Sequence, residues 1–220
     1  MTATDAPAAL TGAGRRPIFP DHHTWPVTIG FEDVYLAPFR RRDIGAWSKL
    51  REGNRAWLDP WEATSPDGVS PTDAREMLAG FRREARAGRM VPWLIRDGRS
   101  EGRPVVGQCT LNNVTYGSAR FATIGYWIGQ EWAGRGIVPV AVALATDYAM
   151  KVMALHRVEI CVRPENAASL RVVEKLGFRY EGIRPRYIHI AGAWRDHKVF
   201  ALDASEVGPG LVDRVIGGRR

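Results

Sequence analysis

The fold of this chain is decided by the segment Asn166-Ala-Ala-Ser169-Leu-Arg-Val-Val-Glu-Lys-Leu-Gly177-Phe178. A strand is predicted just before it, over His156–Val162, and the segment itself predicts a helix over Glu165–Leu176 that ends at a glycine. Asn166 is placed to cap this helix, and Ser169 lies one turn into it. The unit therefore predicts a strand, a capped helix and a glycine stop in succession.

The periodicity on either side of this unit alternates between strands and helices. Further strands are predicted over Val34–Arg40, Val91–Arg96, Pro104–Val114 and Arg120–Gly129, with a final hairpin of Phe178–Ile190 and Trp194–Leu202. Further helices are predicted over Asp43–Trp57, Ser70–Ala87 and Ile137–Met153. The order is β-α-α-β-β-β-α-β-α-β-β, which favours a mixed α/β sheet with helices on both faces.

Composition excludes several classes of protein. With 45% hydrophobic and 25% charged residues in 220, the chain is neither disordered, nor a coiled coil, nor collagen-like. No apolar run reaches the roughly 18–20 residues of a membrane span, and no secretory signal is recognised, so we expect a cytoplasmic protein. Cys109 and Cys161 are too few for a disulfide scaffold or a cysteine-based zinc site, and we expect no metal.

The ends of the chain differ from its middle. Residues 1–26 are rich in Ala, Pro, Gly and Thr and are predicted to be a flexible tail, and residues 204–220 are predicted to be a second tail with a short apolar stretch. One domain is predicted over residues 27–203. The net charge of +7 fits either an anionic ligand or ribonucleoprotein partner, or simply a solvated basic face.

The loop Gly134-Arg135-Gly136-Ile137-Val138-Pro139 joins a predicted strand to a predicted helix. Glycines let backbone N–H groups turn toward a ligand, and a helix start carries partial positive charge, so this junction suits a phosphate or pyrophosphate. Gly-x-Gly also occurs in ordinary tight turns. The loop is not a Walker loop, since no Gly-Lys-Ser/Thr follows, and it lacks the third glycine of the dinucleotide fingerprint.

Together these motifs resemble the GNAT acyltransferase superfamily, which uses acetyl-CoA. In that family Gln/Arg-x-x-Gly-x-Gly/Ala holds the CoA pyrophosphate, and Asn-x-x-Ser-x-x-Val-x-x-Lys-Leu-Gly-Phe marks the pantetheine side. Three further stretches resemble the RimJ-type branch of ribosomal-protein alanine N-acetyltransferases: Trp57-Leu-Asp-Pro-Trp61-Glu, Ile124-Gly-Tyr-Trp-Ile128 and Ile190-Ala-Gly-Ala-Trp-Arg-Asp-His197. The resemblance covers about Val27 to Leu202.

The resemblance implies a mostly antiparallel, twisted sheet that splays apart at the CoA site, with acetyl-CoA as the co-substrate. It places the pyrophosphate on the Gly134–Pro139 loop and the pantetheine arm along the strand Tyr126-Trp127-Ile128. It makes Asn166 a pantetheine contact and gives Ser169 the task of donating a hydrogen bond or proton to the departing thiolate.

Four positions depart from the family patterns. In the pyrophosphate motif Ala133 stands where Gln or Arg is usual, and Val138 where Gly or Ala is usual. Some relatives use a Glu–Tyr pair as acid and base, at positions that are Cys161 and Val173 here. That pair is absent, so the sequence leaves the general base open among Glu165, Tyr187, His189 and His197.

The acceptor side is predicted from aromatic and polar residues. Trp57, Trp61, Tyr187 and His197 are candidate acceptor contacts, with Trp127 beside them, and core packing is the other interpretation of the tryptophans. The α-amine of a peptide has a pKa of about 7.7–8.0, so a strong base is not required.

Three functions stay open from the sequence. The first is acetylation of the N-terminal α-amine of a protein, with a ribosomal protein as the partner. The second is acetylation of a small-molecule amine such as an antibiotic or metabolite, and the third is non-catalytic binding of acyl-CoA or of the ribosome. No direct nucleic-acid binding is asserted from the sequence, and whether the basic charge contacts the ribosome or RNA stays open. We expect no membrane contact, and the oligomeric state stays undetermined.

Overall fold

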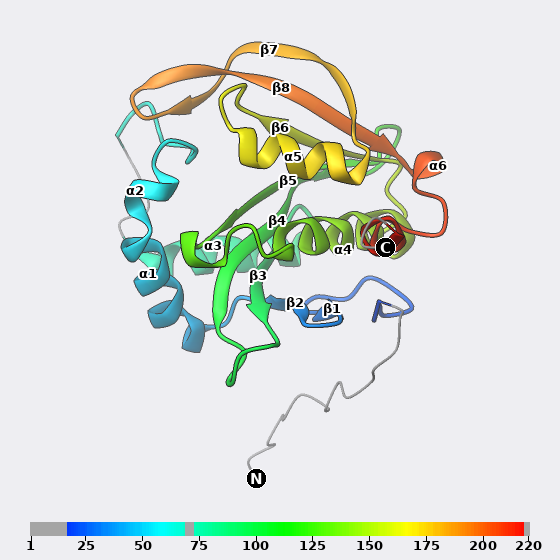
Figure 1. The fold of residues 1–220 in the computed structure, drawn as a ribbon, viewed down its shortest axis with the longest axis horizontal. Coiled ribbons are helices and arrows are strands. Elements are labelled where there is room, and N and C mark those ends of the chain that lie inside the picture. The colour runs from blue at the N-terminus through cyan, green and yellow to red at the C-terminus, as the bar shows by residue number, and fades with distance from the viewer. Residues whose placement is uncertain (1–16, 69–72, 218–220) are drawn as a thin grey trace.

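The structure, a computed structural model, describes residues 17–68 and 73–217. Its centre is an eight-stranded sheet in the order β1-β2-β3-β4-β5-β6-β8-β7 (Figure 1). Neighbouring strands are antiparallel except β5 and β6, which are parallel. The strands are β1 (Ile29–Phe31), β2 (Val34–Pro38), β3 (Val91–Asp97), β4 (Val105–Thr115), β5 (Phe121–Ile128), β6 (Arg157–Val162), β7 (Arg179–Ile190) and β8 (Ala193–Asp203).

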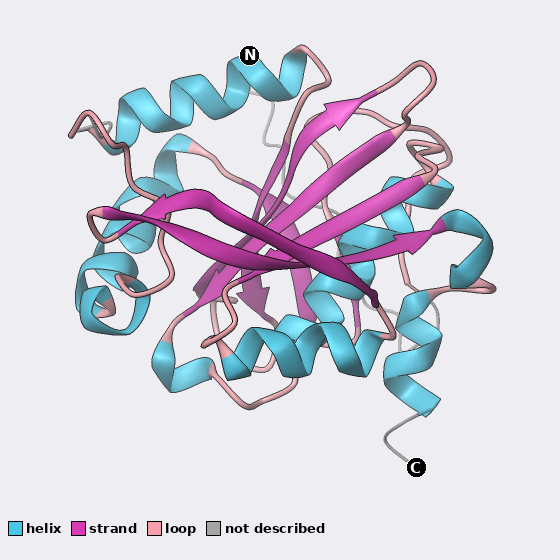
Figure 2. Ribbon diagram, turned by 90° about the horizontal axis from the view of Figure 1, so that it is seen from above, coloured by secondary structure: helices cyan, strands magenta, loops and turns pink. Residues whose placement is uncertain are grey.

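Helices cover both faces of this sheet (Figure 2). Strand β3 shows why: the alternate residues Trp93 and Ile95 join the core cluster that contains α4, whereas Leu94 joins a second cluster with residues of α1 and α3. The predicted mixed, mostly antiparallel sheet with helices on both faces is therefore confirmed. The helices are α1 (Ile44–Gly53), α2 (Arg55–Leu58), α3 (Ala74–Arg86), α4 (Ile137–Lys151), α5 (Ala167–Leu176), α6 (Ala204–Val207) and α7 (Leu211–Gly217).

Two helices differ from the prediction by more than the one or two residues usual at helix ends. The helix expected over Asp43–Trp57 is broken at Asn54, whose side-chain amide donates to the Leu50 carbonyl at 2.8 Å and accepts from the Gln130 N–H at 2.7 Å. The bond to Leu50 is local, and the bond to Gln130 is tertiary; together they replace helix continuation. Helix α3 begins at Ala74 and is capped by Asp73. The residues Ser70–Thr72 of its predicted start lie outside the described residues.

The segments predicted as tails contact the folded core where the structure describes them. Near the N-terminus, the Ile18 N–H donates to the Gly30 carbonyl at 2.9 Å, and His23 Nδ1 lies 2.6 Å from the Tyr148 hydroxyl. Strand β1, which the sequence analysis did not predict, is also here. At the other end the buried Asp147 carboxylate accepts the Leu211 N–H at 2.8 Å and so holds α7 against α4. The predicted boundaries at residues 26 and 203 stay predictions.

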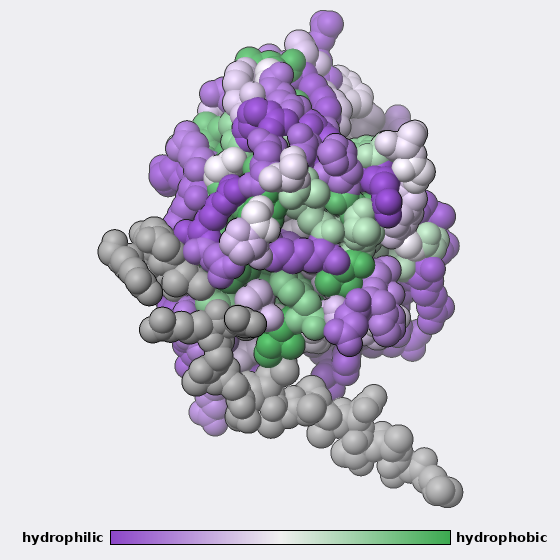
Figure 3. Space-filling view, turned by 90° about the vertical axis from the view of Figure 1, so that its right-hand side faces the viewer, coloured by the Kyte–Doolittle hydropathy of each residue, from purple (hydrophilic) through white to green (hydrophobic). Residues whose placement is uncertain are grey.

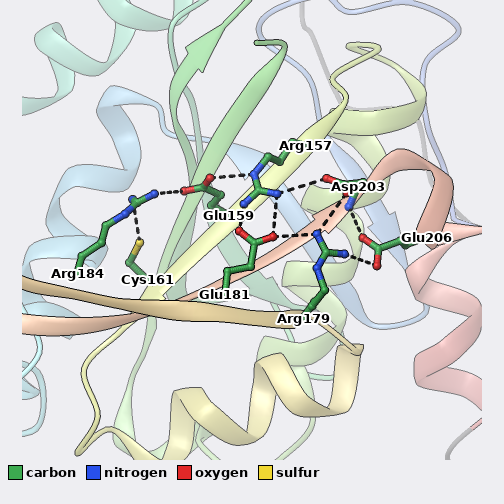
Figure 4. A network of polar contacts seen from close by, with 8 residues as sticks. All are labelled: Arg157, Glu159, Cys161, Arg179, Glu181, Arg184, Asp203 and Glu206. Atoms are coloured by element: carbon green, nitrogen blue, oxygen red, sulfur yellow. Dashed lines mark hydrogen bonds and ion pairs between the residues drawn. The ribbon is translucent and has the colours of Figure 1, made fainter.

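The long hairpin of β7 and β8 is held at one edge of the sheet by a network of ion pairs (Figure 4). In this network each of the three arginines, Arg157, Arg179 and Arg184, forms an ion pair with at least one carboxylate. Hydrogen bonds from Arg157 and Arg179, with Arg157 the larger cause, lower the pKa of Glu181 to about 2. Exposed ion pairs contribute little to stability singly, but this network connects the hairpin to β6 through Arg157 and Glu159.

The face of the molecule seen in Figure 3 is mostly hydrophilic, and hydrophobic residues appear on it in patches between the polar ones.

Among the described helices, none is both long and apolar enough to cross a membrane.

Candidate functional site

The candidate site is the gap that opens where β5 and β6 stop pairing. Their parallel pairing covers only Phe121 to Thr123 on β5 and Arg157 to Glu159 on β6, although both strands continue beyond these residues. A cavity of about 420 Å³ lies at this divergence. Its walls combine β4, β5 and β6 with residues of α1, α3, α5, β7 and β8. The predicted splayed sheet is thus present.

The backbone of β5 is free along one side of this gap. The Gly129 N–H donates to the Val106 carbonyl of β4 at 2.9 Å. In an antiparallel pair, the backbone N–H and C=O groups of successive residues point alternately toward the partner strand and away from it. Since Gly129 bonds to β4, the backbone groups of Ile128 and Tyr126 point away from β4, toward the gap. The Ile128 carbonyl accepts from the Trp57 indole at 3.1 Å. The Tyr126 groups and the Ile128 N–H thus form an edge that can pair with the amides of an extended ligand.

The loop before α4 has the geometry of an anion site. Gly134 and Gly136 have φ angles of +75° and +77°, a conformation that other residues rarely adopt, and Gly136 immediately precedes α4. The first N–H groups of a helix have no acceptor within it, so those of Ile137 and Val138 are available to a ligand. The Arg135 guanidinium lies 4.8 Å from the centroid of the Trp132 ring. The structure thus supplies a helix start without a capping side chain, beside a positive charge.

The start of α5 faces the cavity with two of the predicted residues, Asn166 and Ser169. Asn166 Oδ1 accepts the Ser169 N–H at 3.0 Å, which confirms the predicted cap and leaves the Asn166 amide N–H groups for a ligand. The Ser169 side chain is half-buried, and its hydroxyl interacts with the Tyr126 phenol. Because a hydroxyl rotates about its C–O bond, Ser169 can direct its proton either to the Tyr126 oxygen or into the cavity.

Tyr126 brings a phenol into the same wall. Its hydroxyl donates to the Ser169 carbonyl at 3.5 Å, and burial raises the pKa of Tyr126 to about 12. The phenol is therefore protonated at neutral pH and acts as a donor. The sequence analysis used only the backbone of Tyr126, because the approach of β5 to α5 depends on the whole fold.

Of the four candidate bases, only His197 lines the cavity. Its side chain is 3% exposed, and its Nδ1 lies 3.0 Å from the Arg195 carbonyl. A carbonyl can only accept, so Nδ1 carries the proton and Nε2 keeps its lone pair. Burial is the first cause that lowers the pKa of His197 below the usual 6.5. The imidazole is therefore neutral at pH 7 and able to accept a proton.

The other three candidates have structural contacts. His189 Nδ1 lies 2.8 Å from the Thr64 hydroxyl and ties β7 to the loop before α3. Glu165 is largely exposed and pairs with Arg163 at 3.1 Å. The Tyr187 hydroxyl accepts from Arg184 at 3.2 Å, and its ring packs edge-on against His197 with 6.0 Å between centroids. Tyr187 thus lies behind His197 rather than in the wall.

The predicted tryptophans divide between the cavity and its frame. Trp61 and Trp127 line the cavity, whereas Trp57 holds the end of β5 through its bond to Ile128. Cys161, which stands at the position of a Glu in some relatives, lines the cavity, and burial raises the pKa of its thiol. Val173, at the position of the Tyr, is fully buried.

The charged residues of the wall were not predicted from the sequence. Arg51 lies 5.1 Å from the Trp47 centroid and pairs with Glu62, and burial lowers the pKa of Arg51. Arg163 lies 5.5 Å from the Trp61 centroid. These residues come from separate elements and have no motif in common, so no local pattern marks them. No group of three His, Cys, Asp or Glu residues in the described ranges is placed to hold a metal ion.

Comparison with known proteins gives consistent matches. Residues 33–179, more than half of the chain, match a family model described as an acetyltransferase (GNAT) domain. The [ribosomal protein uS5]-alanine N-acetyltransferase of Escherichia coli K12 is 30% identical over 170 residues, which cover 77% of this chain and 87% of that protein. The probable N-acetyltransferase YjcK of Bacillus subtilis is 41% identical over 98 residues, which are 44% of this chain and 54%, about half, of that relative.

A solved structure matches nearly the whole fold. The structure of Mycobacterium smegmatis RimJ in complex with CoA-disulfide superposes with a TM-score of 0.82 at 39% sequence identity. The match covers 89% of this chain and 96% of that one.

Proposed function

Because the chain belongs to the GNAT family of acetyltransferases, we propose that it transfers the acetyl group of acetyl-CoA to the N-terminal α-amine of a ribosomal protein. Membership confirms the resemblance drawn from the motifs, including its RimJ-type branch. The observation that carries the proposal is the cavity at the β5–β6 divergence, which joins a free strand edge, Ser169 and His197 in one hollow. The cytoplasm stays the predicted location.

The donor groups of the site fit acetyl-CoA. The N–H groups at the start of α4, with Arg135, suit the pyrophosphate. The free edge at Tyr126 and Ile128 suits the two amides of the pantetheine arm, and the amide N–H groups of Asn166 face the same arm. The thioester then lies in the cavity beside Ser169.

The reaction is a direct acyl transfer. The neutral amine attacks the thioester carbonyl carbon, a C–N bond forms, and the C–S bond breaks to release the CoA thiolate. A strand N–H at the open edge of β5 polarises the carbonyl oxygen as negative charge develops on it. The Ser169 hydroxyl donates to the departing sulfur. The remaining task is to remove a proton from the amine.

His197 supplies the proton acceptor. Of the four candidates named from the sequence it alone lines the cavity, and the Glu62 carboxylate in the same wall is paired with Arg51. The Arg195 carbonyl fixes the tautomer that leaves Nε2 basic. Its lowered pKa keeps it neutral at physiological pH. A weak base is adequate, because the α-amine of a peptide itself has a pKa of about 8.

Replacing His197 by Asn is expected to lower kcat at pH 7 by roughly 10- to 100-fold, because general-base contributions are of about this size or larger. Since the folded pKa of His197 lies below 6.5, the wild-type His is already neutral across pH 7–9. The wild-type rate should therefore change little over this range. The variant cannot remove the proton and reacts only with amine that is already neutral, so its rate should rise with pH up to about pH 8 and above. The measurement is the pH dependence of single-turnover rates.

His189→Asn is the matched control, since His189 contacts Thr64 outside the cavity. It should leave the shape of the pH profile unchanged. An identical profile for wild type and His197→Asn would remove His197 from the chemistry.

The charges of the wall favour an acceptor with a single positive charge. Glu62 is the one carboxylate among the described residues that line the cavity, and Arg51 already neutralises it. Arg163, which also lines the cavity, is paired with Glu165, a residue outside the lining. We therefore expect kcat/KM for a peptide that begins with Ala to exceed that for spermidine by about 100-fold or more, which corresponds to roughly 3 kcal/mol. Release of CoA thiol with each amine measures this ratio, and a ratio near one would contradict the assignment.

Intact-mass analysis of ribosomal proteins tests the acceptor itself. Proteins from cells with and without the enzyme should differ by one acetyl group on one ribosomal protein, located at its N-terminus by fragmentation. Unchanged masses, together with turnover of a small amine in a broad panel, would show that the acceptor is a small molecule instead.

A further inference from the structure

A second hollow lies between α3 and the N-terminal end of α1. It has a volume of about 1050 Å³, and five arginines surround the small residue Gly45. We call it the arginine groove and define it by Arg41, Arg75, Arg82, Arg83, Arg86 and Gly45. All five arginines are exposed. The described residues that line the groove include no carboxylate.

The spacing along α3 places three of these arginines in one row. Arg75, Arg82 and Arg86 are seven and four residues apart, which is the repeat of one helix face, and Arg83 lies beside them. With a rise of about 1.5 Å per residue, the row from Arg75 to Arg86 is about 17 Å long. Arg41 faces the row from the segment just before α1. The groove therefore presents a line of positive charges rather than a single point.

This charge is largely uncompensated. Arg83 lies 3.6 Å from Glu84, but the other four arginines form no ion pair with any residue in the described ranges. Elsewhere the protein pairs its arginines closely, as in the network of Figure 4, where Arg157 and Arg179 contact several acids. A row of unpaired guanidiniums is repulsive in isolation and is relieved by a bound polyanion.

The chemistry of the groove favours repeated phosphates over a protein segment. Guanidinium groups bind phosphate through two parallel hydrogen bonds. The apolar part of the lining is small: Leu78 is only 2% exposed, and Ile44 is half-buried. The anchors that hold protein partners are mainly Trp, Tyr and Arg in well-packed, fully desolvated pockets. Here the arginines are exposed, and the described residues that line the groove include no aromatic residue. We propose that the arginine groove binds the phosphate backbone of a structured RNA.

The groove shares its two helices with the acyl-transfer cavity but no lining residue. Helix α1 directs Trp47 and Arg51 to the cavity, and α3 directs Met77 and Phe81 there. RNA in the groove, on the same two helices, would keep an RNA-bound acceptor beside the cavity. This inference goes beyond the proposed acetyl transfer, because neither acetyl-CoA nor the amine uses the groove.

Gly45 gives a clean test, because a Cβ placed there meets no atom within 4 Å. Gly45→Glu puts a negative charge into the groove, while the helix gains a better helix former with an acid in its first turn. Gly53→Glu is the matched control: Gly53 lies on the same helix, is equally open, and is outside the groove. Gly45→Gln controls for side-chain size.

The probe is a fluorescent RNA hairpin of about 20 base pairs, titrated by anisotropy over a range of salt concentrations. Gly45→Glu should bind at least tenfold more weakly than Gly53→Glu and Gly45→Gln. The triple variant Arg75→Gln, Arg82→Gln, Arg86→Gln should lower the slope of log affinity against log salt by roughly one for each phosphate that it no longer neutralises. Peptide acetylation by all these variants should stay at the wild-type rate.

Equal RNA affinity of Gly45→Glu and Gly53→Glu would overturn the proposal, as would tighter binding of a poly-glutamate peptide than of the hairpin. The outcome is independent of the acceptor assignment. RNA affinity is measured without acetyl-CoA, and peptide acetylation is measured without RNA.

Discussion

Replacing Gly136 by Asp is expected to weaken acetyl-CoA binding by about 100- to 1000-fold. Gly136 immediately precedes α4, so its new carboxylate would occupy the position that we assign to the pyrophosphate. Two unit charges about 4 Å apart repel by roughly 4 kcal/mol at an effective dielectric constant of about 20, and each 1.4 kcal/mol is tenfold in affinity. Calorimetry with CoA measures the loss directly.

The backbone at Gly136 calls for a second variant. Its φ of +77° strains any side chain, so Gly136→Asp changes both conformation and charge. Asn has the same shape and tolerates this conformation about as well as Asp does. Gly136→Asn should therefore share the strain but lose much less CoA affinity. Equal affinities of the Asp and Asn variants would show that the pyrophosphate does not lie at this loop.

Replacing Ser169 by Ala is expected to lower kcat by roughly 10- to 1000-fold with a smaller change in the KM for acetyl-CoA. A hydrogen bond to the departing thiolate strengthens as negative charge develops on sulfur, so its loss affects the transition state more than the ground state. The structure places Ser169 in the cavity wall, with its hydroxyl beside the Tyr126 phenol. Single-turnover rates with the best peptide separate chemistry from product release.

The fold should survive this change. Asn166 accepts the backbone N–H of residue 169, which Ala retains, and Ala is a better helix former than Ser. Ser169→Thr keeps a hydroxyl and should restore most of the rate. A folded Ala variant with the wild-type single-turnover rate would transfer the task to Tyr126, whose phenol stays protonated beside Ser169.

Much of the fold was predictable because its signals are local. The cap at Asn166, the glycine end of α5 and the glycines before α4 all depend on residues within one turn of one another. The order of the predicted strands and helices indicated a sheet covered on both faces, and the two core clusters confirm it. The break at Asn54 was not predictable, because its cause is a bond to Gln130, far away in the sequence.

The site divides in the same way. From the sequence came the anion loop, the strand Tyr126–Ile128 and the pair Asn166 and Ser169, since each belongs to a contiguous motif. The sequence also named four candidate bases, but it contained no means of choosing among them. His197 is chosen because β8 places it in the wall of the cavity. His189, on β7, is bonded to Thr64 outside the cavity instead.

By itself, then, the sequence determined the family, the order of elements and the loops whose backbone conformation glycine and capping residues dictate. The tertiary structure alone decided where β5 and β6 part, which side chains meet in the gap between them, and how the arginines of α3 and Arg41 gather in one groove. The physical reason is distance along the chain. Local conformation follows from neighbouring residues, whereas a cavity wall or a charged groove exists only when packing brings separate elements together.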